Sequence, residues 1–403
     1  MNTQSQTLTQ IPPSERITLI DTIRGFALLG ILLVNMVAFQ KTPFAEHVYG
    51  LNDTSSIGLA LTWIEDLLIQ GKFYTLFSML FGFGFAIFMQ RAQAKGASPR
   101  WRFLRRTVGL LIIGFAHAVL LWGGDILMSY AITALLLLFF KNTKPKRLLV
   151  IATVLVSLML LAIWIGVIFA GQGPADEGAE SFSAMAAGLV ADAETIYRSG
   201  SFWQVTAFRL KEWLAFFPTI LNGLPIYLAN FLIGTALARS GIFSDVKGNQ
   251  TFFKKAAIRG LLLGLPLAAF FASFAHQEVM NDKGLSVLQG AAINAQFISN
   301  IALALAYIGL WGWLSHSDNG LAQRLAQVGR LGLSNYLLQS LIFTTFFYGY
   351  GFGFYGQFAH WQLTLMAVAC FLLQILLSGW YLQRFQQGPL EYLWRRFTYG
   401  LRS

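Results

Sequence analysis

The stretch LIDTIRGFALLGILLVN, residues 19–35, places an acid, an arginine and an asparagine on a helix that is otherwise soluble in lipid. An arginine at the centre of a bilayer costs about 3 kcal/mol on insertion scales, so Arg24 requires a partner or a polar cavity. Asp21 precedes Arg24 by less than one helical turn and lies on the same helix face. These residues predict a membrane helix with one polar face.

The composition of the whole chain agrees with this stretch. The 403 residues are 56% hydrophobic and 12% charged, which is more apolar surface than a water-soluble fold can bury. Apolar runs of about eighteen residues or more recur along the chain, each long enough to cross a hydrocarbon core of about 30 Å as a helix. We therefore expect an all-α polytopic membrane helix bundle with about ten transmembrane helices. The expected spans are residues 19–39, 73–89, 103–121, 125–140, 148–170, 213–238, 256–275, 289–314, 331–348 and 361–382.

The loops between these spans alternate in charge. The densest basic cluster lies between Arg91 and Arg106, whereas residues 171–208 carry acidic side chains. Cytoplasmic loops of membrane proteins are rich in Lys and Arg, so we expect both termini in the cytoplasm and residues 171–208 outside. The net charge of +11 then reflects membrane topology, and no nucleic-acid partner is expected.

The expected organisation follows these loops and includes no soluble domain. Residues 1–18 form a cytoplasmic tail, residues 19–238 an N-terminal set of membrane helices, and residues 239–403 a C-terminal membrane region that ends in a cytoplasmic tail. The lipid bilayer is the expected partner, and homo-oligomerisation stays open. Residues 57–69 are apolar but too short to cross the core as a straight helix, which predicts a re-entrant or an interfacial helix there.

Metal chemistry and common catalytic motifs gain no support from the sequence. The five histidines are widely separated and the chain has one cysteine, so no metal site is expected. The GxSxG turn of the hydrolases and the phosphate-binding P-loop are both missing. An enzymatic site would have to be assembled from several helices.

Two histidines are candidates for chemistry. His47 follows the first span and lies near Glu46 and Asp53 in the sequence. A histidine at the mouth of a membrane cavity suits group transfer, and the alternative is a solvated loop residue. His117 lies inside the third span, where Asp125 could be its partner across a short turn. Such a pair either joins helices by hydrogen bonds or lines a pathway.

The later spans carry a second set of polar side chains. Asn335 and Gln339 are prominent among them, because they lie one turn apart within an apolar run. Amides in membrane helices commonly form hydrogen bonds between helices, which is the simpler interpretation here. The wall of a cavity is the alternative.

Three stretches resemble a known family. The pattern DxxRGxALxGIxxxN at residues 21–35 resembles the N-terminal signature of the YeiB-like bacterial membrane proteins. GRLGLSNYLLQS at residues 329–340 and GPLEYLWRRFTY at residues 388–399 are similar to signatures of that family's C-terminal domain of unknown function. The resemblance covers nearly the whole chain and implies a location in the bacterial inner membrane.

The Arg-Gly first helix is also similar to that of transmembrane acyltransferases, including heparan-α-glucosaminide N-acetyltransferase. The simpler enzymes of this kind have a histidine where this chain has Asn35, whereas the glucosaminide enzymes have an asparagine there and a catalytic histidine in the following loop. His47 occupies a similar place, and Asp66 resembles the aspartate before their next membrane segment. This resemblance implies His47 and Asp66 as catalytic residues.

The same resemblance implies a donor and an acceptor. An acyl-CoA, such as acetyl-CoA, would enter from the cytoplasm and pass its acyl group to an envelope glycan or a lipid-linked acceptor. Its expected contacts are Arg24, Asn35, Arg102, Arg105 and Arg106. A small-solute transporter and a structural or regulatory membrane protein remain alternatives, since polar intramembrane residues suit all three classes.

Overall fold

A computed structural model describes residues 17–42, 44–45, 53–94, 99–169, 177–274, 286–315 and 320–399, apart from the side chains of residues 177–183. Every regular element in these ranges is a helix, which confirms the predicted all-α bundle. The first half contains α1 (Thr18–Phe39), α3 (Ser56–Leu68), α4 (Lys72–Ala94), α5 (Pro99–Ala116), the π-helix η2 (His117–Leu121), α6 (Leu127–Leu137), η3 (Leu138–Phe140), α7 (Pro145–Phe169) and α8 (Glu177–Ser199). The second half contains α9 (Phe202–Asn222), α10 (Leu224–Arg239), η4 (Ile242–Ser244), α11 (Gln250–Phe274), α12 (Val287–Leu314), α13 (Gly320–Arg330), α14 (Gly332–Phe347), α15 (His360–Leu382) and α16 (Pro389–Tyr399).

Each predicted span coincides with a helical segment, but not every segment has full crossing length. In the described ranges, seven helices are long and apolar enough to cross a membrane, or eight if α9 and α10, which meet at 53°, count as one broken span. The remaining two predicted spans correspond to α6 with η3 and to α14. These two segments are shorter than the roughly eighteen residues that a full crossing needs.

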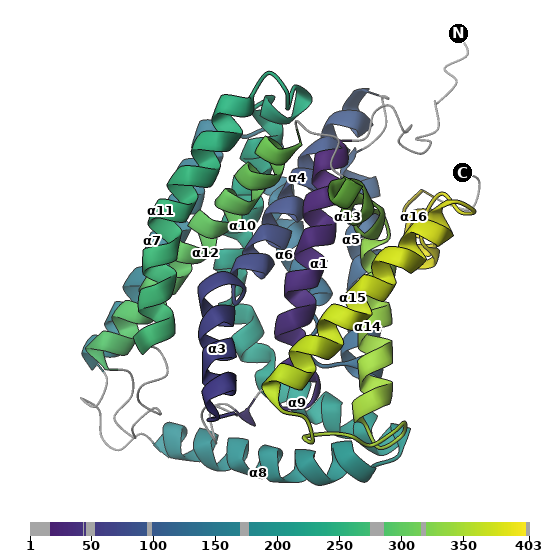
Figure 1. The fold of residues 1–403 in the computed structure, drawn as a ribbon. Helices are drawn as coiled ribbons and strands as arrows, with labels where there is room; N and C mark the ends of the chain where they lie inside the picture. The colour runs from purple at the N-terminus through teal and green to yellow at the C-terminus, as the bar shows by residue number, and fades with distance from the viewer. Residues whose placement is uncertain are drawn as a thin grey trace.

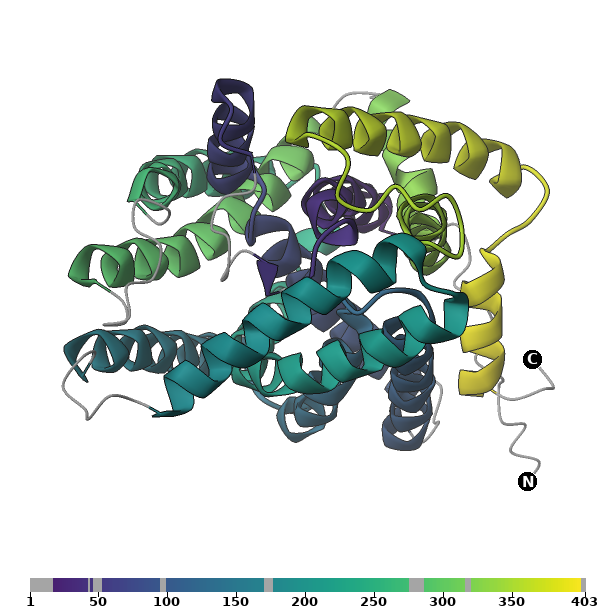
Figure 2. The same ribbon diagram turned by 90° about the horizontal axis from the view of Figure 1, so that it is seen from below.

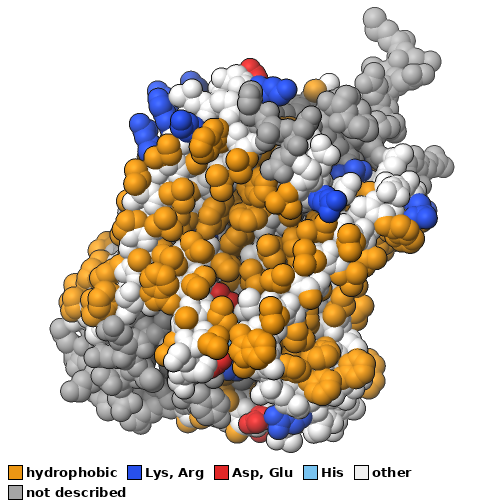
Figure 3. Space-filling model, in the orientation of Figure 1, with side chains coloured by type: hydrophobic (Ala, Val, Ile, Leu, Met, Phe, Trp, Pro, Cys, Tyr) orange, Lys and Arg blue, Asp and Glu red, His pale blue; other side chains and the backbone are white. Residues whose placement is uncertain are grey.

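Helix α1 lies in the middle of the bundle, with α4, α13, α14 and α15 among its neighbours (Figure 1). Its residues Ile23, Ala27 and Leu28 are completely buried. The start of α1 and the C-terminal helix α16 lie at the same end of the molecule, whereas α8 lies across the opposite end (Figures 1 and 2). Apolar side chains cover the middle of the face in Figure 3, as expected of a surface that meets lipid.

Glycines allow α1 and α13 to approach each other closely. A Cβ atom at Gly25 would overlap the carbonyl oxygen of Leu325, and one at Gly329 would overlap that of Asp21. Close backbone contact at small residues is the usual way in which membrane helices pack. Through this contact, α13 and the start of α14 lie against the part of α1 that carries Arg24.

Residues 57–69 differ from the prediction of a re-entrant or interfacial helix. Helix α3 runs along the bundle in Figure 1 and leads into α4, and residues 56–94 together are one candidate span of 39 residues with an interruption. The interruption lies at Gly71, whose φ of +78° is accessible to glycine at little cost. The Lys72 ammonium donates a hydrogen bond to the Asp66 carbonyl across the break.

Candidate functional site

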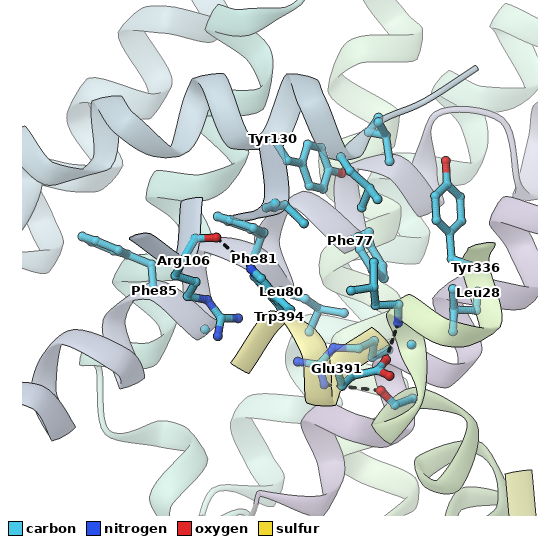
Figure 4. A pocket seen from close by; sticks show the side chains of 18 of the residues that line it. Leu28, Phe77, Leu80, Phe81, Phe85, Arg106, Tyr130, Tyr336, Glu391 and Trp394 are labelled. Atoms are coloured by element: carbon cyan, nitrogen blue, oxygen red, sulfur yellow. Dashed lines mark hydrogen bonds between the residues drawn. The ribbon is translucent and has the colours of Figure 1, made fainter. Parts of the chain in front are cut away.

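A cavity of about 200 Å³ opens between α1, α4, α5, α6, α14 and α16 (Figure 4). Most of its wall is apolar, with Leu28, Phe77 and Leu80 among the lining residues. The lining also includes the charged residues Arg24, Arg106, Arg330 and Glu391. In Figure 4, Tyr130 and Tyr336 lie on the far side of the cavity from Glu391. A mostly apolar cavity with a few convergent polar groups is the usual form of a small-molecule site.

Two arginines bring positive charge to the cavity. The Arg24 guanidinium donates to Asp21 Oδ1 at 2.8 Å, so the costly cation in the first helix has a partner on its own helix. The Arg106 guanidinium stacks over the Trp394 ring at 3.8 Å from the ring centre, and the Trp394 indole N–H donates to the Arg106 carbonyl oxygen at 2.7 Å. Arginine in such a position suits an anionic group such as a phosphate.

Helix α16 forms one wall of the cavity because Glu391 attaches it to α14. The Glu391 carboxylate accepts hydrogen bonds from the backbone N–H groups of Leu333, at 2.7 Å, and Ser334, at 3.0 Å, and from the Ser334 hydroxyl. The backbone N–H groups in the first turn of a helix have no partner within that helix, so a carboxylate there is a favourable cap.

A buried hydrogen-bonded triad of Asp125, His117 and Ser340 lies next to the cavity, where His117 packs against Tyr336. His117 Nδ1 is 2.7 Å from Asp125 Oδ2, and His117 Nε2 is 2.8 Å from the Ser340 hydroxyl oxygen. Asp125 Oδ1 also accepts the backbone N–H of Met128 at 2.8 Å, at the start of α6. The His117 and Asp125 side chains have no exposed surface, and Ser340 is fully buried.

The backbone at His117 departs from an ordinary α-helix. His117 begins η2, a five-residue π-helix that ends α5, and the chain then returns through residues 122–126 to α6. Single π-turns are frequent at functional sites, because they turn a side chain away from the regular helical register. The return places Asp125 against the imidazole eight residues earlier.

A second hydrogen-bonded chain lies beside the triad. The Tyr130 hydroxyl is 2.7 Å from the Ser78 hydroxyl and donates to the Tyr74 carbonyl oxygen at 3.0 Å. The Tyr74 hydroxyl donates to Asn35 Oδ1 at 2.7 Å. Because Tyr130 lines the cavity, this chain connects the cavity wall with Asn35 on α1.

The triad is arranged so that His117 can activate the Ser340 hydroxyl as a nucleophile. If the Asp125 carboxylate accepts the proton on His117 Nδ1, then Nε2 is left as an acceptor for the Ser340 hydroxyl. A nucleophile, a base and an orienting carboxylate in this order recur on unrelated folds that transfer acyl groups. The Tyr336 ring, with its centre 5.1 Å from that of His117, lies between the triad and the cavity that it lines.

Comparison with other proteins then places the chain in a family. YeiB of Escherichia coli (strain K12) is 32% identical over 407 residues, which cover 95% of this chain and 96% of YeiB. The chain belongs to the YeiB-like family. YxaH of Bacillus subtilis (strain 168) is 31% identical over 406 residues, or 96% of this chain and 95% of YxaH. A family model described as "Protein of unknown function (DUF418)" matches residues 237–401, and no solved structure matches the chain.

Family membership confirms the resemblance read from the three sequence signatures. The names of these YeiB-like relatives assign no activity, so any function for this chain must be inferred from the site itself. The signature at residues 329–340 contains Tyr336 and Ser340, and the one at residues 388–399 contains Glu391 and Trp394. Both YeiB-like signatures therefore contribute to the cavity or to the triad.

Among the residues predicted to meet a donor, Arg24 and Arg106 line the cavity and the others do not. Arg105 donates instead to the Phe397 carbonyl oxygen at 2.6 Å, on α16. Arg102 is on the same helix but outside the cavity lining, because successive helical positions point in different directions. Asn35 is buried and reaches the cavity wall through Tyr74 and Tyr130.

Of the predicted pair of His47 and Asp66, the structure describes only Asp66. His47 lies outside the described residues. Asp66 is buried next to Lys72 and does not line the cavity. A different histidine is paired nearby, since His360 Nε2 is 2.9 Å from Glu65 Oε1, and the sequence did not single out this pair.

The other polar residues divide between two roles. The expected partnership of His117 with Asp125 is present, as the triad shows. Asn335 donates to Ser378 at 3.1 Å and Gln339 donates to Gln374 at 2.8 Å, so both side chains join α14 to α15. This is the interhelical role that was the simpler interpretation of the amides.

Sequence reasoning missed Ser340, Tyr130, Tyr336, Glu391 and Trp394 as members of the site. Four of them lie within the two C-terminal signatures, which was the available signal. A signature shows that a stretch is characteristic but gives no partner for any of its side chains. His117 and Ser340 are 223 positions apart, and only the packing of α14 against η2 brings them together.

Proposed function

We propose that this protein is an acyltransferase of the bacterial inner membrane. It takes an acyl group, in the simplest case acetyl, from acyl-CoA and transfers it to a hydroxyl or amine of an envelope glycan or a lipid-linked acceptor. The observation that carries this proposal is the buried triad of Asp125, His117 and Ser340 beside a cavity that contains arginines. No metal takes part in the proposal.

The charges around the cavity support an anionic donor. Arg24 and Arg106 both line the cavity, and charge-assisted hydrogen bonds to phosphate are among the stronger interactions available to arginine. The phosphates of acyl-CoA would bind near these guanidinium groups, and the acyl chain would extend along Leu28 and Phe77 toward Tyr336. The cavity thus offers both a polar and an apolar part for one amphipathic substrate.

The distribution of Lys and Arg supports entry from the cytoplasm. The cavity is lined by Arg24, by Arg106 on α5 and by Glu391 on α16, and the start of α1 and α16 lie at the same end of the bundle (Figure 1). Membrane proteins keep basic loops in the cytoplasm, where acyl-CoA is made. Acyl-CoA would then reach the cavity without first crossing the membrane.

His117 supplies the base in this proposal. Its Nε2 takes the proton of the attacking hydroxyl or amine, and Asp125 holds the ring and stabilises the imidazolium that forms. Burial removes competing water from around these groups, so their electrostatic interactions are stronger than they would be in solution.

Transfer of radiolabelled acetyl from acetyl-CoA tests the function in inverted membrane vesicles that contain the overproduced protein and endogenous acceptors. We expect label in an envelope acceptor and release of free CoA with the wild type, and background values with His117→Ala. His360→Gln is the matched control, because His360 is also a buried histidine paired with a carboxylate but lies outside the cavity lining. A wild type that transfers no more acetyl than vesicles without the protein would overturn the proposal.

A parallel His47→Ala variant separates the two histidines. If His47→Ala abolishes transfer while His117→Ala retains it, acyl transfer stands and the base is His47, as the resemblance to the glucosaminide enzymes implies. If only His117→Ala abolishes transfer, the triad is the site.

The second candidate function is transport of a small solute. It is favoured by the break between α9 and α10, since discontinuous helices commonly form the binding sites of transporters. Uptake of labelled solutes into proteoliposomes tests it, and uptake without any consumption of acyl-CoA would favour transport. A structural or regulatory role remains if neither assay responds to the protein.

A further inference from the structure

The Ser340 hydroxyl has an unusual orientation for a serine in a membrane helix. A buried helical Ser or Thr normally donates to the carbonyl oxygen four residues earlier, as Ser78 does to Tyr74 at 2.8 Å. In Ser340 the corresponding distance, to the Tyr336 carbonyl oxygen, is 3.5 Å. Its distance to His117 Nε2 is 2.8 Å, so the imidazole is the better partner for the hydroxyl proton.

We propose that Ser340 is the nucleophile of the acyl transfer and carries the acyl group as a covalent ester. This inference rests on the proposed function and adds an intermediate to it. The nearest proton that His117 Nε2 can accept is that of Ser340, because the hydroxyl oxygen lies 2.8 Å from that nitrogen. An acceptor molecule could approach the same nitrogen only after Ser340 had turned away.

Aromatic side chains pack against the triad from the cavity and from the connection between η2 and α6. Tyr336 lies between His117 and the cavity. In the connection between η2 and α6, Trp122 packs with its ring centre 6.4 Å from the imidazole, and Phe39 packs on Trp122 at 4.3 Å. A donor from one end and an acceptor from the other would have to displace both barriers at once to react directly. A covalent intermediate lets each barrier open in turn.

The first half-reaction begins with proton transfer from the Ser340 hydroxyl to His117 Nε2. The Ser340 oxygen attacks the thioester carbonyl carbon, a C–O bond forms and the C–S bond breaks. The CoA thiolate leaves and takes the proton from the His117 imidazolium. The products are acyl-Ser340, neutral His117 and CoA.

The second half-reaction follows the same path in reverse. His117 Nε2 takes the proton of the acceptor hydroxyl or amine, whose oxygen or nitrogen attacks the ester carbonyl carbon. The bond between that carbon and the Ser340 oxygen breaks, and the serine oxygen recovers the proton from His117. No oxidant, metal or further reactant is needed, and Asp125 holds the imidazole throughout.

The test uses the full-length protein in lipid nanodiscs with labelled acetyl-CoA and no acceptor. We expect a rapid burst of free CoA that approaches about one per chain, and an acetyl group on the peptide that contains Ser340 by mass spectrometry. Ser340→Ala should show neither the burst nor the label. Ser340→Cys should form a thioester, from which neutral hydroxylamine releases the label.

Ser378→Ala is the control for a buried serine. Ser378 accepts a hydrogen bond from Asn335 on α14 but has no contact with the triad, so its variant should keep the burst. Retention of a labelled thioester in Ser340→Cys shows that position 340 can be changed without loss of the fold. Thermal unfolding of every variant is followed in parallel.

Different results would contradict the covalent intermediate and the proposed function. If Ser340→Ala transfers acetyl to the acceptor at the wild-type rate and no label appears on the wild-type serine, the covalent intermediate is wrong and acyl transfer stands. If the wild type neither releases CoA nor transfers acetyl to any acceptor, both are wrong.

Discussion

At the scale of single residues, Asp125 is a buried carboxylate with a partner for each of its oxygens. One oxygen faces His117 Nδ1 and the other accepts a backbone N–H at the start of α6, so the carboxylate is buried with both oxygens in use. A buried charge of this kind is tolerated only when its partners are in place. The same contacts determine the tautomer of His117 and therefore which of its nitrogens can act as a base.

Asp125→Asn should slow acyl transfer while leaving the fold intact. The amide is the same size as the carboxylate, but it stabilises the imidazolium poorly and allows the other tautomer. We expect kcat to fall by about 10²- to 10⁴-fold with the donor KM unchanged. Steady-state kinetics over a range of pH checks this, because a positioning role also shifts the pH profile.

Asp192→Asn is the matched control for Asp125, since Asp192 is an exposed acid 3.6 Å from Lys211. Exposed ion pairs contribute little to stability or function, so no change in kcat is expected. An Asp125→Asn variant with wild-type kcat at every pH would show that the carboxylate has no role in transfer.

Arg106→Gln should weaken donor binding. Arg106 lines the cavity, and hydrogen bonds to charged groups contribute about 1.5–3 kcal/mol, which corresponds to a KM for acyl-CoA about 10- to 150-fold higher. Arg100→Gln, at an exposed position near the start of the same helix, should leave the KM unchanged. Equal KM values for the two variants would contradict the proposed phosphate contact.

At the scale of elements, the contact between α1 and α13 determines where the cavity lies. Gly25 and Gly329 allow the two backbones to touch, and Arg24 next to Gly25 is then directed to the cavity that Gly332 and Leu333 also line. Helix α16 adds the outer wall through Glu391 and Trp394. The cavity therefore depends on a small number of close contacts between elements far apart in the sequence.

Gly25→Ala should destabilise the protein. A methyl group there would overlap the Leu325 carbonyl oxygen, and overpacking of this kind costs about 1–3 kcal/mol. Gly166→Ala on α7 is the control, because a methyl group at Gly166 meets no atom within 4 Å. Thermal unfolding in detergent measures both variants, and a Gly25→Ala midpoint at or above the wild-type value would contradict the close packing.

At the scale of the whole molecule, the two ends of the bundle have different roles in the proposed function. One end carries the start of α1 and α16, both of which contribute to the cavity lining, whereas α8 lies across the other end (Figures 1 and 2). The proposed donor is cytosolic and the proposed acceptor belongs to the envelope. The orientation of the bundle in the membrane is therefore a requirement of the proposed function.

Cysteine labelling tests this orientation in a Cys370→Ser background. Glu194→Cys lies on α8, at an exposed position, and should react with a membrane-impermeant maleimide in intact spheroplasts. Lys247→Cys, exposed between η4 and α11, should react only after permeabilisation. The opposite pattern would place the arginines outside and remove the reason for a cytosolic donor.

The sequence predicted the helices well and the site only in part. The hydropathy of each segment gave the positions of the spans, and the pair of His117 and Asp125 could be predicted because the two residues are only eight positions apart. The length of residues 57–69 predicted a separate short helix and gave no sign that α3 and α4 together form one long candidate span. The arginines at 102, 105 and 106 could not be told apart, since their contacts depend on where α16 packs.

The sequence by itself determined that the chain is a helical membrane protein of the YeiB-like family with costly polar groups inside its helices. Transfer of a helix into lipid depends on the residues of that helix, so composition and spacing were sufficient. The tertiary structure alone decided that His117 meets Ser340 and that Arg106 meets Trp394, contacts that join residues 223 and 288 positions apart. Such contacts depend on how the surfaces of several helices fit together, which no single stretch of sequence contains.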